Sequence, residues 1–77
     1  MRFAKSEIAR AQTGVKNYYG TYYPVETIVH RVNDCFRSRP YWTVTFDQWN
    51  GSPASDARYK TKREAMAAFN AHVKGED

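Results

Sequence analysis

The sequence predicts an α+β fold in a small single domain, with two N-terminal helices, an antiparallel β-hairpin that leaves room for a third strand, and a C-terminal helix. Three observations indicate this class. A helix-capping pattern begins at Thr61, apolar and polar residues alternate over residues 41–49, and apolar residues recur at helical spacing after Pro24. A chain of 77 residues buries only a small core, so we expect residues 1–77 to fold as one domain.

The C-terminal helix has the clearest local signals. Thr61 and Glu64 form a capping box, in which the Thr61 hydroxyl accepts from the Glu64 backbone N–H and the Glu64 carboxylate reaches back toward the N–H of Thr61. Apolar residues then recur at helical spacing as far as Val73, and Gly75 stands where a left-handed C-terminal cap is typical. The helix is therefore expected from about residue 62 to 74.

The hairpin is expected immediately before this helix. Along its first strand the apolar side chains face inward and the polar ones outward, which separates Trp42, Val44 and Phe46 from Thr43, Thr45 and Asp47. Asn50 and Gly51 begin a turn-rich stretch, and residues 56–60 return with Ala57 and Tyr59 facing inward. Strand parity places Trp49 on the outer face, unless a bulge turns it inward.

The N-terminal half is expected to be helical. Ser6 is a suitable N-cap for a short helix over about residues 7–13, which Gly14 ends. A second helix over residues 25–36 is predicted because apolar residues stand at positions 25, 28, 29, 32 and 36, with Pro24 in the first turn. The β-branched run at residues 27–29 favours a strand, so helix and strand both stay open for residues 25–36.

Composition excludes several classes of protein. Aromatic residues make up 16% of the chain, which argues against a disordered protein. No apolar run approaches the roughly 20 residues that span a bilayer, and charges near the N-terminus replace the apolar region of a signal peptide. Cys35 is the single cysteine, so no internal disulfide forms, as is typical of a reducing compartment. We expect a cytoplasmic protein without membrane contact.

No motif indicates catalysis, a metal or a cofactor. The sequence lacks metal-ligand spacings, a nucleophile elbow and a phosphate-binding loop. His30 and Cys35 have no third group to orient them, and His72 follows the apolar stripe of the last helix, where it borders the core. The sequence therefore predicts a non-enzymatic protein that uses no cofactor or metal.

Two kinds of residue indicate a binding surface instead. Basic residues gather between Arg31 and Arg63, most densely at the start of the last helix, where a phosphate or a carboxylate would be attracted. Four tyrosines occur within residues 17–23, and tyrosine, tryptophan and arginine are frequent in binding hot spots. The expected partner-binding residues are Tyr18, Tyr19, Tyr22, Tyr23, Trp49, Arg58, Lys60, Lys62 and Arg63.

The hairpin and the segment that follows it, Tyr-Lys-Thr-Lys-Arg-Glu-Ala at residues 59–65, resemble the N-terminal arm-type DNA-binding domain of phage and transposon tyrosine recombinases. In that family a strand ends in a basic Thr/Ser-Lys-x-Glu-Ala helix start. The resemblance covers residues 42–73 and implies DNA binding. The family domain uses three strands, whereas this stretch of sequence predicts two.

Size, basic charge and aromatic content also resemble the small accessory proteins of phages and mobile elements, including anti-CRISPR proteins, which block a host nuclease complex by occupying a working surface. This resemblance implies a phage-encoded inhibitor in the host cytoplasm that contacts a host protein or nucleoprotein complex. The alternative is direct binding of DNA or RNA through the hairpin and the basic start of the last helix. Either protein would be a monomer or a homodimer.

Overall fold

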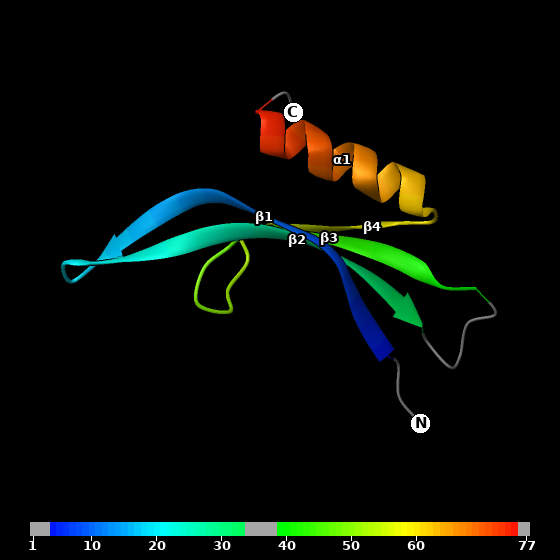
Figure 1. Cartoon of the computed structure of the whole chain (residues 1–77). Helices are drawn as coiled ribbons and strands as arrows, with labels where there is room; N and C mark the ends of the chain where they lie inside the picture. Colours follow the sequence, from blue (N-terminus) through cyan, green and yellow to red (C-terminus); the bar gives the residue numbers. More distant parts are fainter. Residues whose placement is uncertain (1–3, 34–38, 76–77) are drawn as a thin grey trace.

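A computed structural model describes residues 4–33 and 39–75, which form a four-stranded antiparallel sheet followed by one helix (Figure 1). The strands are β1 (Ala4–Tyr18), β2 (Thr21–Asn33), β3 (Tyr41–Gln48) and β4 (Ser55–Tyr59), and the helix is α1 (Lys62–Lys74). The strands lie side by side in chain order. The helix in the described part of the chain is too short and too polar to cross a membrane.

The prediction of two N-terminal helices is wrong, because residues 7–13 belong to β1 and residues 25–33 form the strand alternative as part of β2, while residues 34–36 lie outside the described residues. In β2 the β-branched residues 27–29 are all buried, at the centre of the sheet. Apolar residues at positions 25, 28, 29 and 32 match helical spacing, yet their pairing with β1 and β3 decides the structure. Residues 17–23, which contain four tyrosines, form the tip of the hairpin between these two strands.

The β1–β2 hairpin closes with a two-residue turn, and a second two-residue turn lies within the connection between β3 and β4. At the first turn Tyr19 and Gly20 have φ angles of 51° and 81°, and at the second turn Asn50 and Gly51 have φ angles of 52° and 81°. Positive φ at both central residues matches the twist of antiparallel strands. The second turn is closed by two backbone hydrogen bonds between Trp49 and Ser52, of 3.1 and 2.9 Å.

The prediction for α1 is confirmed. The Glu64 backbone N–H donates to the Thr61 hydroxyl at 3.2 Å, and Gly75 ends the helix in the left-handed conformation with φ 77°. Ala65 and Phe69 are buried against the sheet, as apolar helical spacing requires. The β3–β4 hairpin that precedes α1 is also present, with Ala57 and Tyr59 half-buried.

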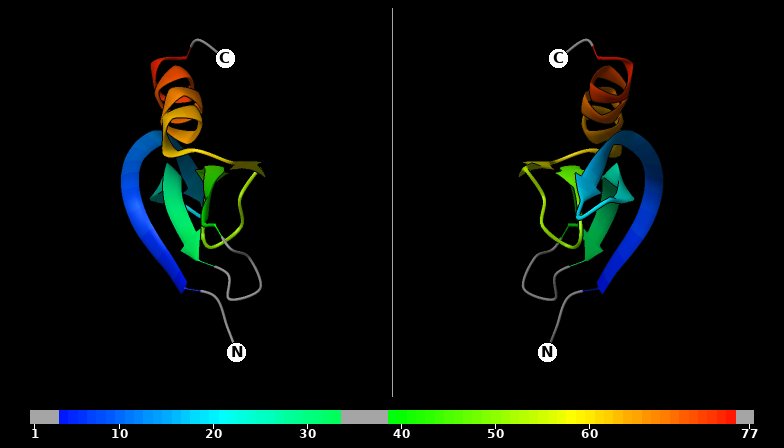
Figure 2. Two further views of the ribbon diagram at one scale, coloured as in Figure 1. Left: turned by 90° about the vertical axis from the view of Figure 1, so that its right-hand side faces the viewer. Right: turned by 90° about the vertical axis from the view of Figure 1, so that its left-hand side faces the viewer.

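The core lies between α1 and one face of the sheet. Val29 and Val44 pair across β2 and β3 on this face and pack with Ala65 and Phe69 of α1. Views along the sheet show α1 on one side only, and the turn that follows β3 lies on the other side (Figure 2). We call the side without a helix the uncovered face.

A bulge in β3 corrects the expected position of Asp47. The pairing with β2 shifts between Ile28 and Glu26, and Asp47 takes a positive φ of 51°. The bulge turns the Asp47 side chain to the side of α1, instead of leaving it beside Thr43 and Thr45. Parity after the bulge also changes, and Trp49 is half-buried.

The β1–β2 hairpin extends past the rest of the sheet, because β3 pairs with β2 only from Glu26 onward. Pro24 lies in this extension, where its missing N–H faces no third strand. The molecule measures 46 × 30 × 16 Å, and its radius of gyration is 13.6 Å. A compact chain of this length would have a radius of about 11.5 Å, so the extended hairpin lengthens the molecule.

Candidate functional site: a polar sheet face between a basic end and an aromatic tip

Polar side chains lie in register on the uncovered face. His30 pairs with Thr43, and Thr43 pairs with Arg58, so these three form one row across β2, β3 and β4. Thr45 follows two residues later on the same face of β3. The Arg58 guanidinium lies 4.6 Å from the centre of the Tyr41 ring, where it is attracted to the π face. This patch offers hydrogen-bonding groups on one face of the curved sheet (Figure 2).

His30 occupies the middle of the patch. Burial lowers the pKa of this imidazole, nearby cations such as Lys5 lower it further, and Glu7 opposes them. The ring is therefore held neutral at pH 7. Its Nδ1 atom is buried and has no hydrogen-bond partner among the described residues. An unpaired buried polar atom is costly, and the Nε1 atoms of Trp42 and Trp49 are in the same situation.

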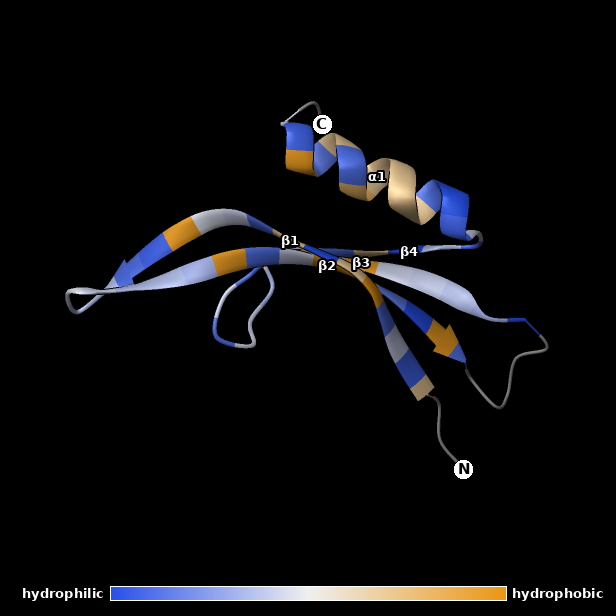
Figure 3. Cartoon of the chain, in the orientation of Figure 1, coloured by the Kyte–Doolittle hydropathy of each residue, from blue (hydrophilic) through white to orange (hydrophobic). Residues whose placement is uncertain are grey.

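Cationic side chains gather at one end of the sheet, which we call the basic end. The end of β2, the start of β3, the end of β4 and the first turn of α1 meet there. The first turn of α1 is strongly hydrophilic (Figure 3). Backbone N–H groups at the helix start add partial positive charge. The basic end consists of Arg31, Arg39, Arg58, Lys60, Lys62 and Arg63, all exposed.

Exposed tyrosines cover the tip of the β1–β2 hairpin. Tyr19 and Tyr22 are 89% and 69% exposed, and the centres of the Tyr18 and Tyr19 rings lie 4.4 Å apart. Trp49 packs against this tip, with its ring centre 5.5 Å from Tyr18 and 5.8 Å from Tyr23. We call these five residues the aromatic tip.

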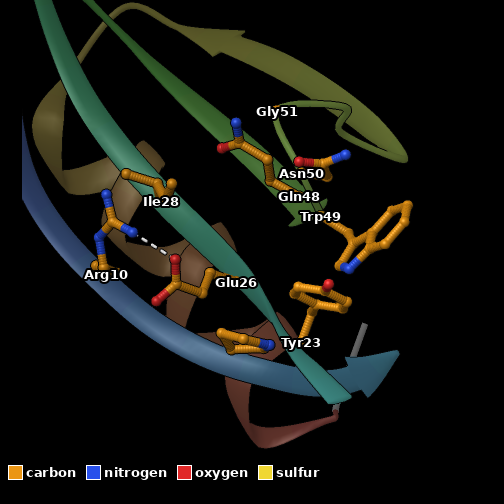
Figure 4. A pocket seen from close by; sticks show the side chains of 9 residues that line it. Arg10, Tyr23, Glu26, Ile28, Gln48, Trp49, Asn50 and Gly51 are labelled. Carbon is orange, nitrogen blue, oxygen red and sulfur yellow. Dashed lines mark hydrogen bonds and ion pairs between the residues drawn. The ribbon is translucent and has the colours of Figure 1, made fainter. Parts of the chain in front are cut away.

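A hollow of about 280 Å³ separates the hairpin from the turn after β3 (Figure 4). Tyr23 and Trp49 border one side of it, Ile28 lies at the other side, and the side-chain amides of Gln48 and Asn50 lie above. The hollow therefore has aromatic walls and hydrogen-bonding groups at its rim. It opens on the uncovered face, next to the aromatic tip.

Arg10 in this hollow is already neutralised. Its guanidinium donates to both carboxylate oxygens of Glu7, at 2.8 and 3.1 Å, and also to Glu26. The hydrogen bond from Arg10 lowers the pKa of Glu7, and the same bond raises the pKa of Arg10. The aromatic side of the molecule therefore carries little net charge, unlike the basic end.

A ring of hydrogen bonds lies on the side of α1. The Asp47 backbone N–H donates to the Thr27 hydroxyl at 3.2 Å, the Thr27 hydroxyl lies 3.2 Å from that of Thr13, and Thr13 donates to the Asp47 carboxylate at 2.7 Å. The His72 Nε2 atom is 2.9 Å from the same carboxylate oxygen. Hydrogen bonds from His72 and then Thr13 lower the pKa of Asp47.

This ring joins side chains on the side of α1. The Thr13 hydroxyl donates to the Asp47 carboxylate, and the same carboxylate oxygen contacts His72 Nε2. The four side chains come from β1, β2, β3 and α1, and they tie these elements together. Among residues 4–33 and 39–75, no three His, Cys, Asp or Glu side chains converge as metal ligands would.

The structure divides the expected partner-binding residues into two groups. Tyr18, Tyr19, Tyr22, Tyr23 and Trp49 come together at the aromatic tip, whereas Arg58, Lys60, Lys62 and Arg63 lie at the basic end. The two groups lie at opposite ends of the long axis in Figure 1. They do not form one continuous surface.

Sequence reasoning missed the centre of the uncovered face and the ring around Thr27. His30 was considered only with Cys35, which lies outside the described residues. Alternation in β1, where Ala9 and Ala11 are more buried than Arg10 and Gln12, was the available signal for a strand. No local signal marks the ring, because its members lie up to 59 residues apart in the sequence, from Thr13 to His72.

Comparison of this chain with protein-family models, curated proteins and solved structures finds no match.

Proposed function

We propose that this chain binds nucleic acid, with the uncovered face against the bases or sugars and the basic end on the phosphates. The observation that carries the proposal is that Arg58 belongs to both surfaces, so the polar patch and the cations are continuous. Lysine and arginine contacts to phosphates supply most of the affinity for nucleic acid. Threonine, histidine and arginine side chains supply hydrogen bonds to bases.

Dimensions also support this proposal. Strands lie about 4.8 Å apart, so β2, β3 and β4 together span about 10 Å. The major groove of B-DNA is about 12 Å wide, and β-sheets are known to enter it. The order β2, β3, β4 and α1 gives three strands before the helix, as in the arm-type DNA-binding domain that the sequence resembles.

A titration of labelled duplex DNA at two salt concentrations tests the proposal. Lys60→Gln with Lys62→Gln removes two cations from the basic end, so the slope of log affinity against log salt should fall by about 2. The matched control, Lys16→Gln with Lys74→Gln, removes the same charge away from this end and should leave the slope unchanged. Equal slopes for both pairs, or no binding in low salt, would contradict the proposal.

A second candidate function uses the aromatic tip. Tyr19 and Tyr22 are far more exposed than aromatic residues usually are, and the surface around them carries little net charge. Such a surface suits a protein partner. In this role the chain is a phage-encoded inhibitor of the anti-CRISPR type, which acts in the host cytoplasm by covering part of a nucleic-acid-handling complex.

The two functions predict opposite mutational effects. In a DNA-cleavage assay with a purified host nuclease complex, Tyr19→Ala with Tyr22→Ala should abolish inhibition, whereas Lys60→Gln with Lys62→Gln should retain it. Inhibition that survives loss of the two tyrosines excludes the aromatic tip as the inhibitory surface. Inhibition lost only with the lysines would mean competition for DNA at the basic end.

A further inference from the structure

The two outer strands of the sheet differ in regularity. β1 is interrupted by register shifts at Ile8 and Thr13, and bulges of this kind prevent an edge strand from pairing with another chain. β4 has no shift, because its pairing with β3 runs unbroken from Ser55 to Tyr59. β4 also forms the margin of the molecule (Figure 2). Its outer edge is thus a regular strand edge with no strand beside it in the described chain.

The charges of β4 are complementary to themselves. Asp56 and Arg58 lie on either side of Ala57, and both side chains are exposed on the same face. When two copies of β4 run antiparallel and are centred on Ala57, Asp56 of each copy stands opposite Arg58 of the other. Opposite charges in directly facing positions stabilise strand pairing, whereas like charges destabilise it. Charged residues usually protect an edge, but this pair attracts its own copy.

We propose that a second copy of this chain pairs with β4, so that two sheets join into one of eight strands. The symmetry axis passes through Ala57, perpendicular to the sheet, and both helices therefore lie on the same side. α1 packs mainly over β2 and β3, which leaves space between the two helices. Lys60 of one copy faces residue 54 of the other, so the two basic ends are held apart.

This pairing joins the two uncovered faces into one surface. If the proposed function holds, the dimer presents two equivalent nucleic-acid surfaces related by a two-fold axis, as a palindromic duplex requires. The dimer itself does not depend on that function. Pairing of five residues on each strand buries little surface, so we expect a weak dimer at high micromolar concentration.

Variants that change the charges at positions 56 and 58 test the pairing. Their association is measured by sedimentation velocity from about 10 µM to about 1 mM protein. Asp56→Arg or Arg58→Asp alone places like charges opposite each other and should weaken association at least roughly tenfold. The double variant Asp56→Arg with Arg58→Asp has the original net charge, and it should restore association. Circular dichroism establishes that each variant is folded.

A second measurement uses the unaltered chain. On dilution, amide NMR shifts should change for residues 54–60 and stay constant for the outer residues of β1. A monomer throughout the concentration range, association that the double variant fails to restore, or dilution shifts confined to another surface would overturn the proposal. Neither measurement contains nucleic acid. A negative result for the dimer therefore does not contradict the proposed function, and absence of DNA binding does not contradict the dimer.

Discussion

Thr27 is the residue on which the polar interior depends. It is fully buried, and its hydroxyl both accepts from the Asp47 backbone N–H and lies within hydrogen-bond distance of Thr13. The hydroxyl oxygen and proton are therefore both in use. A buried polar group that loses its partner costs more than the hydrogen bond gained when it was paired.

Thr27→Val keeps the shape of the side chain and removes the hydroxyl. We expect a loss of about 1–3 kcal/mol in the free energy of unfolding, because the Asp47 N–H is left without its acceptor. Urea denaturation measures this change. Thr45→Val on the uncovered face makes the same substitution outside the ring and should change stability by less than about 0.5 kcal/mol. Equal effects of the two substitutions would show that the ring contributes nothing.

Asp47 gives the fold a dependence on acid. Its pKa in the folded protein is lowered by hydrogen bonds from His72 and Thr13, so the unfolded chain binds the proton more readily. Stability from this group is therefore complete above the ordinary aspartate pKa, near pH 4, and is lost as pH falls through the folded pKa. Urea denaturation between pH 7 and pH 2.5 should show a flatter acid limb for Asp47→Asn than for the unaltered chain. An identical acid limb would contradict this role.

At the scale of elements, the extension of the β1–β2 hairpin depends on one side chain. Residues 14–25 pair only with each other, and an isolated two-stranded hairpin is marginally stable in water. Trp49 supplies the contact to the rest of the sheet through the rings of Tyr18 and Tyr23, and the Lys16 ammonium lies 5.1 Å from its ring centre.

Trp49→Ala should loosen this extension while the sheet stays folded. Aromatic pairs contribute about 0.5–1.5 kcal/mol each, so amide hydrogen exchange in residues 15–23 should become at least roughly tenfold faster. Protection at Val29 and Val44 should not change. Tyr22→Ala, which removes an exposed ring from the same extension, serves as the control and should leave exchange near the wild-type rate. Uniform loss of protection would mean that Trp49 supports the whole fold.

Local signals account for the half of the fold that the sequence predicted. The capping box at Thr61, the Gly75 cap and the turn at Asn50 and Gly51 act over a few residues, and they define β3, β4 and α1. β1 is rich in alanine, glutamate, arginine and glutamine, which favour helices in isolation. Its strand conformation comes from pairing with residues up to 29 positions away, such as Ala4 with Asn33.

The candidate site was only partly predictable for the same reason. Exposure of the tyrosines follows from their place around a turn, and the sequence predicted a loop there, although between two helices and not between two strands. The aromatic tip is separated from the basic end because the β1–β2 hairpin is long. The residues of β1 favour a helix in isolation, so the sequence did not predict this hairpin. The role of His30 follows from its row with Thr43 and Arg58, a relation that exists only in the sheet.

The whole molecule is a curved sheet covered on one side by α1, with different chemistry at its two ends. One end is basic, the other is aromatic and nearly neutral, and the uncovered face between them presents polar side chains in register. Its accessible surface of 5620 Å² exceeds the roughly 4,850 Å² expected for a compact protein of this mass. The additional surface reflects the elongated shape of the molecule.

Mapping of amide NMR shifts during addition of a DNA duplex tests the central claim most directly, because one experiment reports on every surface. We expect shifts at Thr43, Thr45, Arg58 and Lys60 and in the first turn of α1. We also expect added salt to reverse these shifts. Shifts confined to residues 17–23, or no shifts at millimolar duplex in low salt, would contradict binding through the uncovered face and the basic end.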